Sequence, residues 1–414
     1  MKAQKLLKNV FKGDTAICVI YLLLSLISLI AVYSSIGLSA IVDSGSTPLK
    51  QFIKHLLFVV ASYVVVIFFA NLDYRGLSKW SPVFIFIAGT ILAAAIVFHW
   101  GRWVNLGVAT FQPSELAKPA IILFLSRELT LHKDRVKEWP FFRQLIILMA
   151  IIAGLILPEN FSTAALVCVV SMLVMLYGGV SFKYWTRVVL IVAVLAGIGL
   201  FVAYKEYTAK EELRQHEIAT VNDEGNKPLP RIITWGHRMD SWLHPDVDAL
   251  TQENMSRMAV ASGKIFGVGT GATVQARLMT QAHNDFIYAV IIEEKGMLAG
   301  IIIFLLYTIL FHRCIKIAQR CKEQFGKLCA AGLGSLIYIQ AVVNMCVVVG
   351  VLPVTGQTLP LISYGGTSYL CMGAIVGMIQ SVAFATMKTE KIQKEQARRD
   401  AGFEELKELA GVKD

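Results

Sequence analysis

Charged residues are scarce in this 414-residue chain. They make up 16% of it, against about 25% in an average soluble domain, whereas hydrophobic residues make up 56%. Internal repeats of about 20–50 residues are lacking, which excludes a solenoid or a propeller. A dense group of His, Cys, Asp and Glu with metal-ligand spacing is absent as well, so the sequence leaves open whether a metal ion binds.

Long apolar runs fill the sequence instead. A bilayer core about 30 Å thick needs about 20 apolar residues per helix. The sequence therefore predicts an all-α polytopic membrane protein, a single domain over residues 1–414 with about ten transmembrane helices. The predicted spans are 14–36, 51–71, 81–99, 116–130, 144–158, 161–179, 184–204, 286–311, 328–350 and 366–386.

Lys and Arg decide the predicted orientation. Loops on the side of the N-terminus carry roughly twice as many of them as loops on the other side, which places both termini in the cytoplasm. Residues 1–13 then form a cytoplasmic N-terminus, and residues 387–414 form a cytoplasmic tail that is either a charged helix or a frayed end. The same bias explains the net charge of +10, so no nucleic-acid partner is expected. None of the seven cysteines lies in an outer loop, so no external disulfide is expected.

A large outer loop, residues 205–285, separates the seventh and eighth predicted spans. Loops of this length are usually functional or disordered. In its stretch "RIITWGHRMDSWLHP", Arg231 and Arg238 either meet anionic groups at the membrane surface or are simply solvated. The stretch "SGKIFGVGTGATVQ" is rich in glycine, but no strand precedes it, which excludes a nucleotide-binding loop and favours a flexible or tightly turning segment.

Two charged residues lie at the start of a predicted span, in "GRWVNLGVATFQPSELAKPA". Glu115 and Lys118 are three residues apart and therefore share a helix face, with Ser114 as the expected N-cap. Charge within a membrane is costly unless it is paired or faces a wet cavity. We expect the two side chains to pair within the helical body, either as a structural link or as part of a polar cavity.

The stretch "VLPVTGQTLPLISYGGTSYLC" combines prolines and glycines that exclude a continuous helix. Irregular backbone near membrane depth is tolerated only where protein buries it or where it lines a cavity. We expect an irregular segment from Pro353 to Ser368 that folds over an outer cavity. Ser363 and Thr367 would contribute hydroxyl groups there.

The stretch "AHNDFIYAVIIEEKGMLAG" places Asp285 where the span 286–311 begins, with Glu293 and Glu294 about two turns further on. Asp285 either caps this helix or removes a proton as a general base. The residues alone leave a membrane-embedded transferase and a transporter equally open.

Four stretches resemble motifs of the SEDS family (shape, elongation, division and sporulation), whose members include FtsW and RodA. They are, in the family's order, "RWVNLGVATFQPSELAKPAIILFLS", "GKIFGVGTG", "AHNDFIYAVIIEEKGMLAG" and "LPVTGQTLPLISYGGTSYL". The opening "FKGDTAICVIYLLLSLISLIAVYSS" is more like division-type FtsW. The chain departs from the family twice: Asn284 replaces a threonine, and Asn160 in "PENFSTA" stands where an aspartate is usual.

The resemblance implies a peptidoglycan glycosyltransferase that polymerises lipid II at the outer face of the bacterial cytoplasmic membrane during cell division. It implies that Asp285 is the catalytic base. Residues around it would bind the substrate, and the candidates are Arg102, Glu115, Lys118, Arg231, Arg238, His283, Ser363 and Thr367.

The resemblance also implies partners. These are a class B penicillin-binding protein, which is the cross-linking transpeptidase, and other divisome or elongasome membrane proteins. A divalent cation, Mg²⁺ or Mn²⁺, stays open as a further counter-charge for the leaving pyrophosphate. The alternative function is a lipid II flippase, which an inverted repeat would favour, and the sequence has none. A pure scaffold would give no reason for Asp285.

Overall fold

We describe the protein from a computed structural model. The described residues are 13–39, 48–98, 100, 102–105, 110–187, 205, 238–239, 241–243, 251–279 and 282–409. The helices and strands are α2 (Thr15–Ser39), α3 (Pro48–Asn71), α4 (Tyr74–Val97), β1 (Val104–Asn105), β2 (Thr110–Phe111), α5 (Pro113–Leu131), η1 (Lys133–Arg135), α6 (Trp139–Ile156), α7 (Phe161–Tyr177), α10 (Gln252–Gly263), α11 (Gln275–Leu278), α12 (Ile287–Lys295), α13 (Met297–Arg320), α14 (Gln324–Val348) and α15 (Gly366–Leu409).

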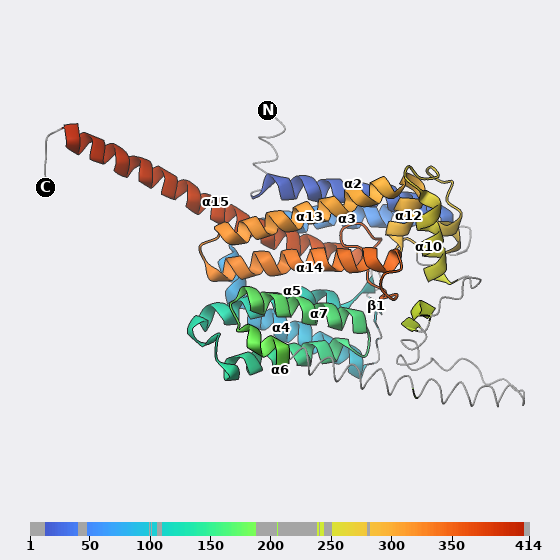
Figure 1. The fold of residues 1–414 in the computed structure, drawn as a ribbon, viewed down its shortest axis with the longest axis horizontal. Coiled ribbons are helices and arrows are strands. Elements are labelled where there is room, and N and C mark those ends of the chain that lie inside the picture. Colours follow the sequence, from blue (N-terminus) through green and yellow to red (C-terminus); the bar gives the residue numbers. More distant parts are fainter. Residues whose placement is uncertain are drawn as a thin grey trace, which may run out of the picture.

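Long helices lie side by side in a bundle (Figure 1). In the described residues, seven helices are long and apolar enough to cross a membrane: α2, α3, α4, α6, α13, α14 and α15. Helix α7 is apolar but shorter, and α5 carries charged residues. The prediction of an all-α polytopic membrane protein is confirmed. The count of ten spans stays a prediction, because most of the span predicted at 184–204 lies outside the described residues.

Helices α14 and α15 form the centre of the bundle. Of their apolar windows, 72% is buried inside the protein, against 22% for α3 at the periphery. Helix α15 packs along α3. Gly373 and Gly377 allow this close approach, since a Cβ at either position would overlap Ser62 or Val66 of α3. Small residues serve the same purpose between helices in many membrane proteins.

The single span predicted over 286–311 is wrong. The chain forms two helices there, α12 and α13, and Gly296 separates them with φ 84° and ψ 172°. Side chains rarely adopt this backbone conformation, so the helix ends at Lys295. Helix α12 lies beside α10 at one end of the bundle (Figure 1), and α13 makes the span. Asp285 therefore precedes a short helix outside the spans.

Helix α15 continues without a break at residue 387. It extends as one helix to Leu409 and projects from the end of the bundle opposite α12 (Figure 1). The helical alternative for the tail is thus confirmed as far as Leu409. Helix α2 begins at the same end of the bundle. Asp14, just before it, forms an ion pair with Arg313 of α13, and the backbone carbonyl of Asp14 accepts a hydrogen bond from the side-chain amide of Gln380 in α15.

The segment between α14 and α15 is irregular, as predicted. No helix or strand forms from Pro353 to Gly365, whereas residues 366–368 already belong to α15. The segment enters the protein interior: the hydroxyl of Ser28 donates to the carbonyl of Ile362 (2.8 Å), and that of Tyr307 donates to the carbonyl of Pro360. Its backbone is therefore satisfied by side chains of α2 and α13, which is how irregular backbone is tolerated in a membrane protein. That it covers a cavity stays a prediction.

Candidate active site

Two amide side chains on α14 hold this irregular segment in place. Gln340 and Asn344 lie one helical turn apart and are at most 1% exposed. Gln340 donates to the carbonyl of Thr358 (3.1 Å), and Asn344 donates to the carbonyl of Gln357 (2.7 Å). Asn344 also donates to the carbonyl of Asp285 (2.8 Å). Helix α14 thereby fixes the backbone of Asp285 relative to the irregular segment.

Two arginines from different loops are bound to the same segment. Arg102 donates a hydrogen bond from its guanidinium to the carbonyl of Gly356, and Arg238 donates to the carbonyl of Val354 (3.2 Å). These carbonyls are only two residues apart in the chain. Arg102, Arg238 and Asp285 are far apart in sequence, and the irregular segment brings them together.

Gly356 leaves space between these side chains. A Cβ at this position would lie 3.6 Å from Oδ2 of Asp285 and 3.0 Å from Nη1 of Arg102. The residue has φ +65°, in the left-handed region that favours glycine. Asp285 and Arg102 therefore both lie beside the α-carbon of Gly356, and a side chain at this position would press on them.

The carboxyl group of Asp285 has a raised pKa. Burial is the largest cause, because it disfavours the charged form, while the positive charges of Arg102 and Arg238 oppose it and lower the pKa. The capping alternative is wrong for this residue: α12 begins at Ile287, and Phe286 occupies the cap position. A carboxylate whose pKa is shifted upward between two cations is a common arrangement for acid–base chemistry.

His283, two residues before Asp285, also contacts the irregular segment. Its carbonyl accepts a hydrogen bond from the backbone N–H of Tyr364 (2.9 Å), and its ring packs edge-on against the Tyr364 ring with centroids 5.5 Å apart. These two contacts attach the residues just before Asp285 to the end of the irregular segment. His283 thus belongs to the same cluster as Asp285, Arg102 and Arg238.

Glu115 and Lys118 form the ion pair that the sequence predicts. Lys118 Nζ lies 2.7 Å from Glu115 Oε1 and also donates to Gln340 Oε1 (3.0 Å). Both residues are buried, at 5% and 1% exposure, so they face protein rather than lipid. The expected cap is wrong: α5 starts at Pro113 with Gln112 in the cap position, not Ser114. Through Gln340 the pair reaches the irregular segment.

The remaining candidates have local structural contacts. The hydroxyl of Ser363 accepts a hydrogen bond from the backbone N–H of Leu359 (2.7 Å). The hydroxyl of Thr367 donates to the carbonyl of Thr110 (2.9 Å), which connects α15 to β2. Arg231 lies outside the described residues. Substrate contact by these residues stays a prediction.

Asn160, which stands where the resembling family has an aspartate, caps α7. Its Oδ1 accepts a hydrogen bond from the backbone N–H of Thr163 (3.1 Å). Asparagine and aspartate cap helices about equally well. The departure therefore preserves this local structure while removing a negative charge.

The residues near Asp285 do not fit a divalent cation. Across the described part of the chain, no group of three or more His, Cys, Asp and Glu side chains is placed to hold a metal ion. The nearest charged groups that act on Asp285 are Arg102 and Arg238, which would repel a cation.

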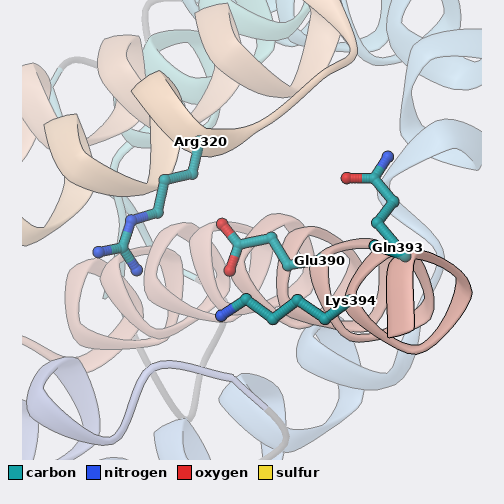
Figure 2. Close-up of a pocket in the computed structure, with 5 residues that line it drawn as sticks. Arg320, Glu390, Gln393 and Lys394 are labelled. Carbon is teal, nitrogen blue, oxygen red and sulfur yellow. The ribbon is translucent and has the colours of Figure 1, made fainter. Parts of the chain in front are cut away.

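A shallow pocket lies at the other end of the bundle, where α15 leaves it. It is lined by Arg320, Glu390, Gln393, Lys394 and Ala397. Figure 2 shows Glu390 between Arg320 and Lys394, so charges of both signs alternate across it. It is on the opposite side of the protein from Asp285 and forms no part of the candidate site.

Sequence reasoning missed Gln340 and Asn344. Both are polar residues within the apolar run of α14, spaced four residues apart. Polar side chains in a span normally face the protein interior and have partners there. That spacing was the available signal, but only the structure places their partners.

The chain is similar to known proteins over most of its length. The "Cell cycle protein" family, which groups FtsW, RodA and SpoVE, matches residues 14–388. A probable peptidoglycan glycosyltransferase FtsW of Bacillus subtilis (strain 168) is 28% identical, over 96% of this chain and 97% of its own. A protein of the same description from Geobacter sp. (strain M18) is 30% identical, over 76% of this chain and 81% of its own.

Solved structures share the fold. A chain of a peptidoglycan synthase complex that coordinates polymerization and crosslinking aligns with a TM-score of 0.68 at 22% identity, over 90% of this chain and 98% of its own. The rod shape determining protein RodA of Thermus thermophilus aligns with a TM-score of 0.60 at 19% identity, over 91% of this chain and 98% of its own. At these identities the likeness establishes the fold alone.

Proposed function

The chain belongs to the cell cycle protein family of FtsW, RodA and SpoVE, and from this premise we propose that it is a peptidoglycan glycosyltransferase that polymerises lipid II during cell division. The observation that carries the proposal is the placement of Asp285 beside Arg102 and Arg238 in a loop outside the spans. One site then offers a base for an attacking hydroxyl and cations for a leaving pyrophosphate.

Asp285 is the general base of the proposed reaction. The 4-hydroxyl of one sugar attacks the anomeric carbon of another, a new carbon–oxygen bond forms, and the bond to the pyrophosphate breaks with inversion. The hydroxyl proton passes to the carboxylate of Asp285. Burial raises the pKa of Asp285 and so makes the carboxylate a stronger base, while Arg102 and Arg238 favour the ionised form that must accept the proton.

Arg102 and Arg238 also suit the leaving group. Pyrophosphate departs with negative charge, and fixed guanidinium groups stabilise such charge where it develops. Hydrogen bonds to the carbonyls of Gly356 and Val354 hold both side chains in place before the substrate arrives. Arg231 would add a third cation from the predicted outer loop that also carries Arg238.

The site fits a substrate that is anchored in a membrane. The excess of Lys and Arg on the side of the N-terminus supports cytoplasmic termini, which would put the end with α12 at the outer face. In that orientation Asp285, which lies outside the candidate spans, would meet the pyrophosphate of a lipid-linked sugar at the outer surface. The Glu115–Lys118 pair is buried within the protein and would act by positioning the irregular segment through Gln340.

A class B penicillin-binding protein is the proposed partner. The support is the similarity in fold to a chain from a peptidoglycan synthase complex that combines polymerization with crosslinking. Other divisome membrane proteins would join it. Lipid II transport is the second candidate function, but the relatives named for their function are transferases, which favours the enzyme.

The test is Asp285→Asn in purified protein with its transpeptidase and labelled lipid II. Asparagine keeps the shape but accepts no proton, so glycan polymerisation should fall by about two to four orders of magnitude while lipid II binding persists. Asp285→Glu is the matched control, because it retains a base. A near-wild-type polymerisation rate for Asp285→Asn would refute the assignment. If the wild-type protein moved lipid II across liposome membranes but did not polymerise it, the flippase would be favoured.

A further inference from the structure

An exposed apolar surface lies on the glycine-rich segment that follows α10. Ile265 is 60% exposed and Phe266 is 82% exposed, more than any other large hydrophobic residue in the described part of the chain. Val268 adds a third apolar side chain at 43% exposure. None of these residues takes part in the proposed reaction, so their exposure needs a separate explanation.

This segment is attached to the start of a membrane span. The backbone N–H of Met297 donates to the carbonyl of Lys264 (2.8 Å), and that of Leu298 donates to the carbonyl of Ile265 (3.4 Å). The first N–H groups of a helix have no acceptor within the helix, and here the segment supplies carbonyl acceptors for two of them. The apolar surface therefore begins where α13 begins.

The neighbouring face of α13 is turned to lipid. Leu298, Ile301, Ile302 and Leu305 are 47–52% exposed and follow one another at the spacing of a single helix face. In a helix that spans a membrane, such a stripe contacts acyl chains. Met297, 50% exposed at the end of this helix, joins the stripe to Ile265 and Phe266.

Two lysines flank the apolar surface. Lys264 precedes Ile265 and Lys295 is the last residue of α12, and both are exposed. Lys295 donates a hydrogen bond to the hydroxyl of Thr270. Lysines beside exposed apolar side chains are typical of segments at a membrane interface, where the ammonium groups meet anionic headgroups.

The segment is firmly held on α12. Val268 and Gly269 donate backbone hydrogen bonds to the carbonyls of Glu293 (2.8 Å) and Glu294 (3.1 Å). The carboxylate of Glu293, which is 1% exposed, accepts from the backbone N–H groups of Val274 (2.9 Å) and Gln275 (3.0 Å). The carboxylate of Glu294, also buried, accepts from the hydroxyl of Ser34 and from the backbone N–H of Gly271 (3.4 Å), so both glutamates of the sequence motif have buried partners.

Close backbone packing reinforces this attachment. A Cβ at Gly267 would overlap the carbonyl of Glu294, and a Cβ at Gly296 would overlap that of Ile265. The glycines thus let the segment lie directly on the end of α12. A contact that fixes the position of Ile265 and Phe266 therefore also fixes the position of α12, the helix that Asp285 precedes.

We propose that residues 264–268, with Met297 and Leu298, form an interfacial wedge that inserts into the bilayer at the end of α13. Phospholipid covers this surface: acyl chains contact Ile265 and Phe266, and headgroups contact Lys264 and Lys295. Continuity with the lipid-facing stripe of α13 favours lipid over a protein partner. The wedge would fix the depth of α12 in the membrane.

The test places the photoreactive amino acid p-benzoylphenylalanine at position 266 of the full chain in nanodiscs of phosphatidylglycerol and phosphatidylcholine. The same residue at Phe304, within the lipid-facing part of α13, gives the yield expected for full lipid contact. At Ala272, exposed beyond the wedge, it gives the background. Lipid adducts at position 266 should exceed that background about tenfold and approach the yield at Phe304.

Ile265 provides an independent second position for the probe, in case the aromatic ring at 266 tolerates no substitution. A yield at both positions no higher than at Ala272 would overturn the wedge, as would adducts formed mainly with protein. The crosslink is measured without turnover. Its failure would therefore be distinct from any failure of the proposed reaction.

Discussion

Arg102 and Asp285 meet at the α-carbon of Gly356. A Cβ there would lie 3.0 Å from the arginine Nη1 and 3.6 Å from the carboxylate Oδ2. The two residues come from different loops, and the segment that carries Gly356 is held by Gln340 and Asn344 of α14. The candidate site is therefore assembled on a piece of irregular backbone rather than on a helix.

Gly356→Ala tests this arrangement directly. The added methyl group would press on Arg102, and the residue would be strained at φ +65°, which costs about 1–3 kcal/mol. Polymerisation by the purified protein should fall by roughly tenfold or more, because a displacement of about 1 Å at a reacting group has effects of that size.

Gly365→Ala is the matched control within the same segment. Its Cβ would lie 3.4 Å from the nearest atom, in Ser368, and its φ is outside the left-handed region. We expect its polymerisation rate to stay within about twofold of the wild type. Equal losses in the two variants would contradict a specific role for the space at Gly356.

The pH dependence of kcat/KM should show a raised acidic limb. Asp285 accepts a proton only when it is ionised, so the rate falls as the pH falls through its pKa. Burial raises that pKa above the ordinary aspartate value of about 3.9, and the limb should lie above this pH.

Arg102→Gln should move this limb further. The positive charge of Arg102 lowers the pKa of Asp285, so its removal raises the pKa and shifts the limb to higher pH. Arg135→Gln, an exposed change near η1, is the control and should leave the limb in place. A limb that stays fixed or moves to lower pH in Arg102→Gln would show that a different group titrates.

Local chemistry made part of this site predictable from sequence. A charged pair in an apolar run must find a partner, which predicted the contact of Glu115 and Lys118. Pro353, Gly356 and Pro360 cannot continue a helix, which predicted the irregular segment. In both cases the energetic cost of the alternative is large and local.

Other features depend on contacts between distant residues. The break at Gly296 follows the charged run from Glu293 to Lys295, which the prediction of one long span overlooked. The conformation of Gly296 follows from the backbone of Ile265 packed against it. Arg102, Arg238 and Asp285 carry no common spacing. Only the packing of α14 against the irregular segment brings their loops together.

Asn344→Leu should reduce catalysis more than stability alone explains. The change keeps the number and branching of the side-chain heavy atoms but removes the amide nitrogen that donates to the carbonyls of Asp285 and Gln357. We expect kcat to fall about tenfold or more with little change in KM, because the base is displaced while substrate binding elsewhere persists.

Gln340→Leu separates positioning from general damage to α14. It removes the hydrogen bond to Thr358 and one partner of Lys118 but leaves the contact with Asp285 intact. If Asn344 acts through Asp285, its variant should lose the larger share of kcat at a comparable unfolding temperature. A larger loss in Gln340→Leu would place the effect in the packing of the irregular segment instead.

The Glu115–Lys118 pair makes a prediction about single and double changes. Lys118→Met alone leaves the carboxylate of Glu115 buried without its cation, and such a stranded charge costs about 3–5 kcal/mol. Lys118→Met combined with Glu115→Gln removes both charges and leaves groups of similar volume. In detergent, the double variant should therefore unfold at a higher temperature than the single one. It should also recover part of the polymerisation activity that the single variant loses, if the pair acts by supporting the irregular segment through Gln340.

A double variant that is as stable as wild type but wholly inactive would instead indicate that one of the two charges contacts the substrate. A double variant less stable than Lys118→Met would mean that the pair stabilises the fold by more than its mutual compensation of charge.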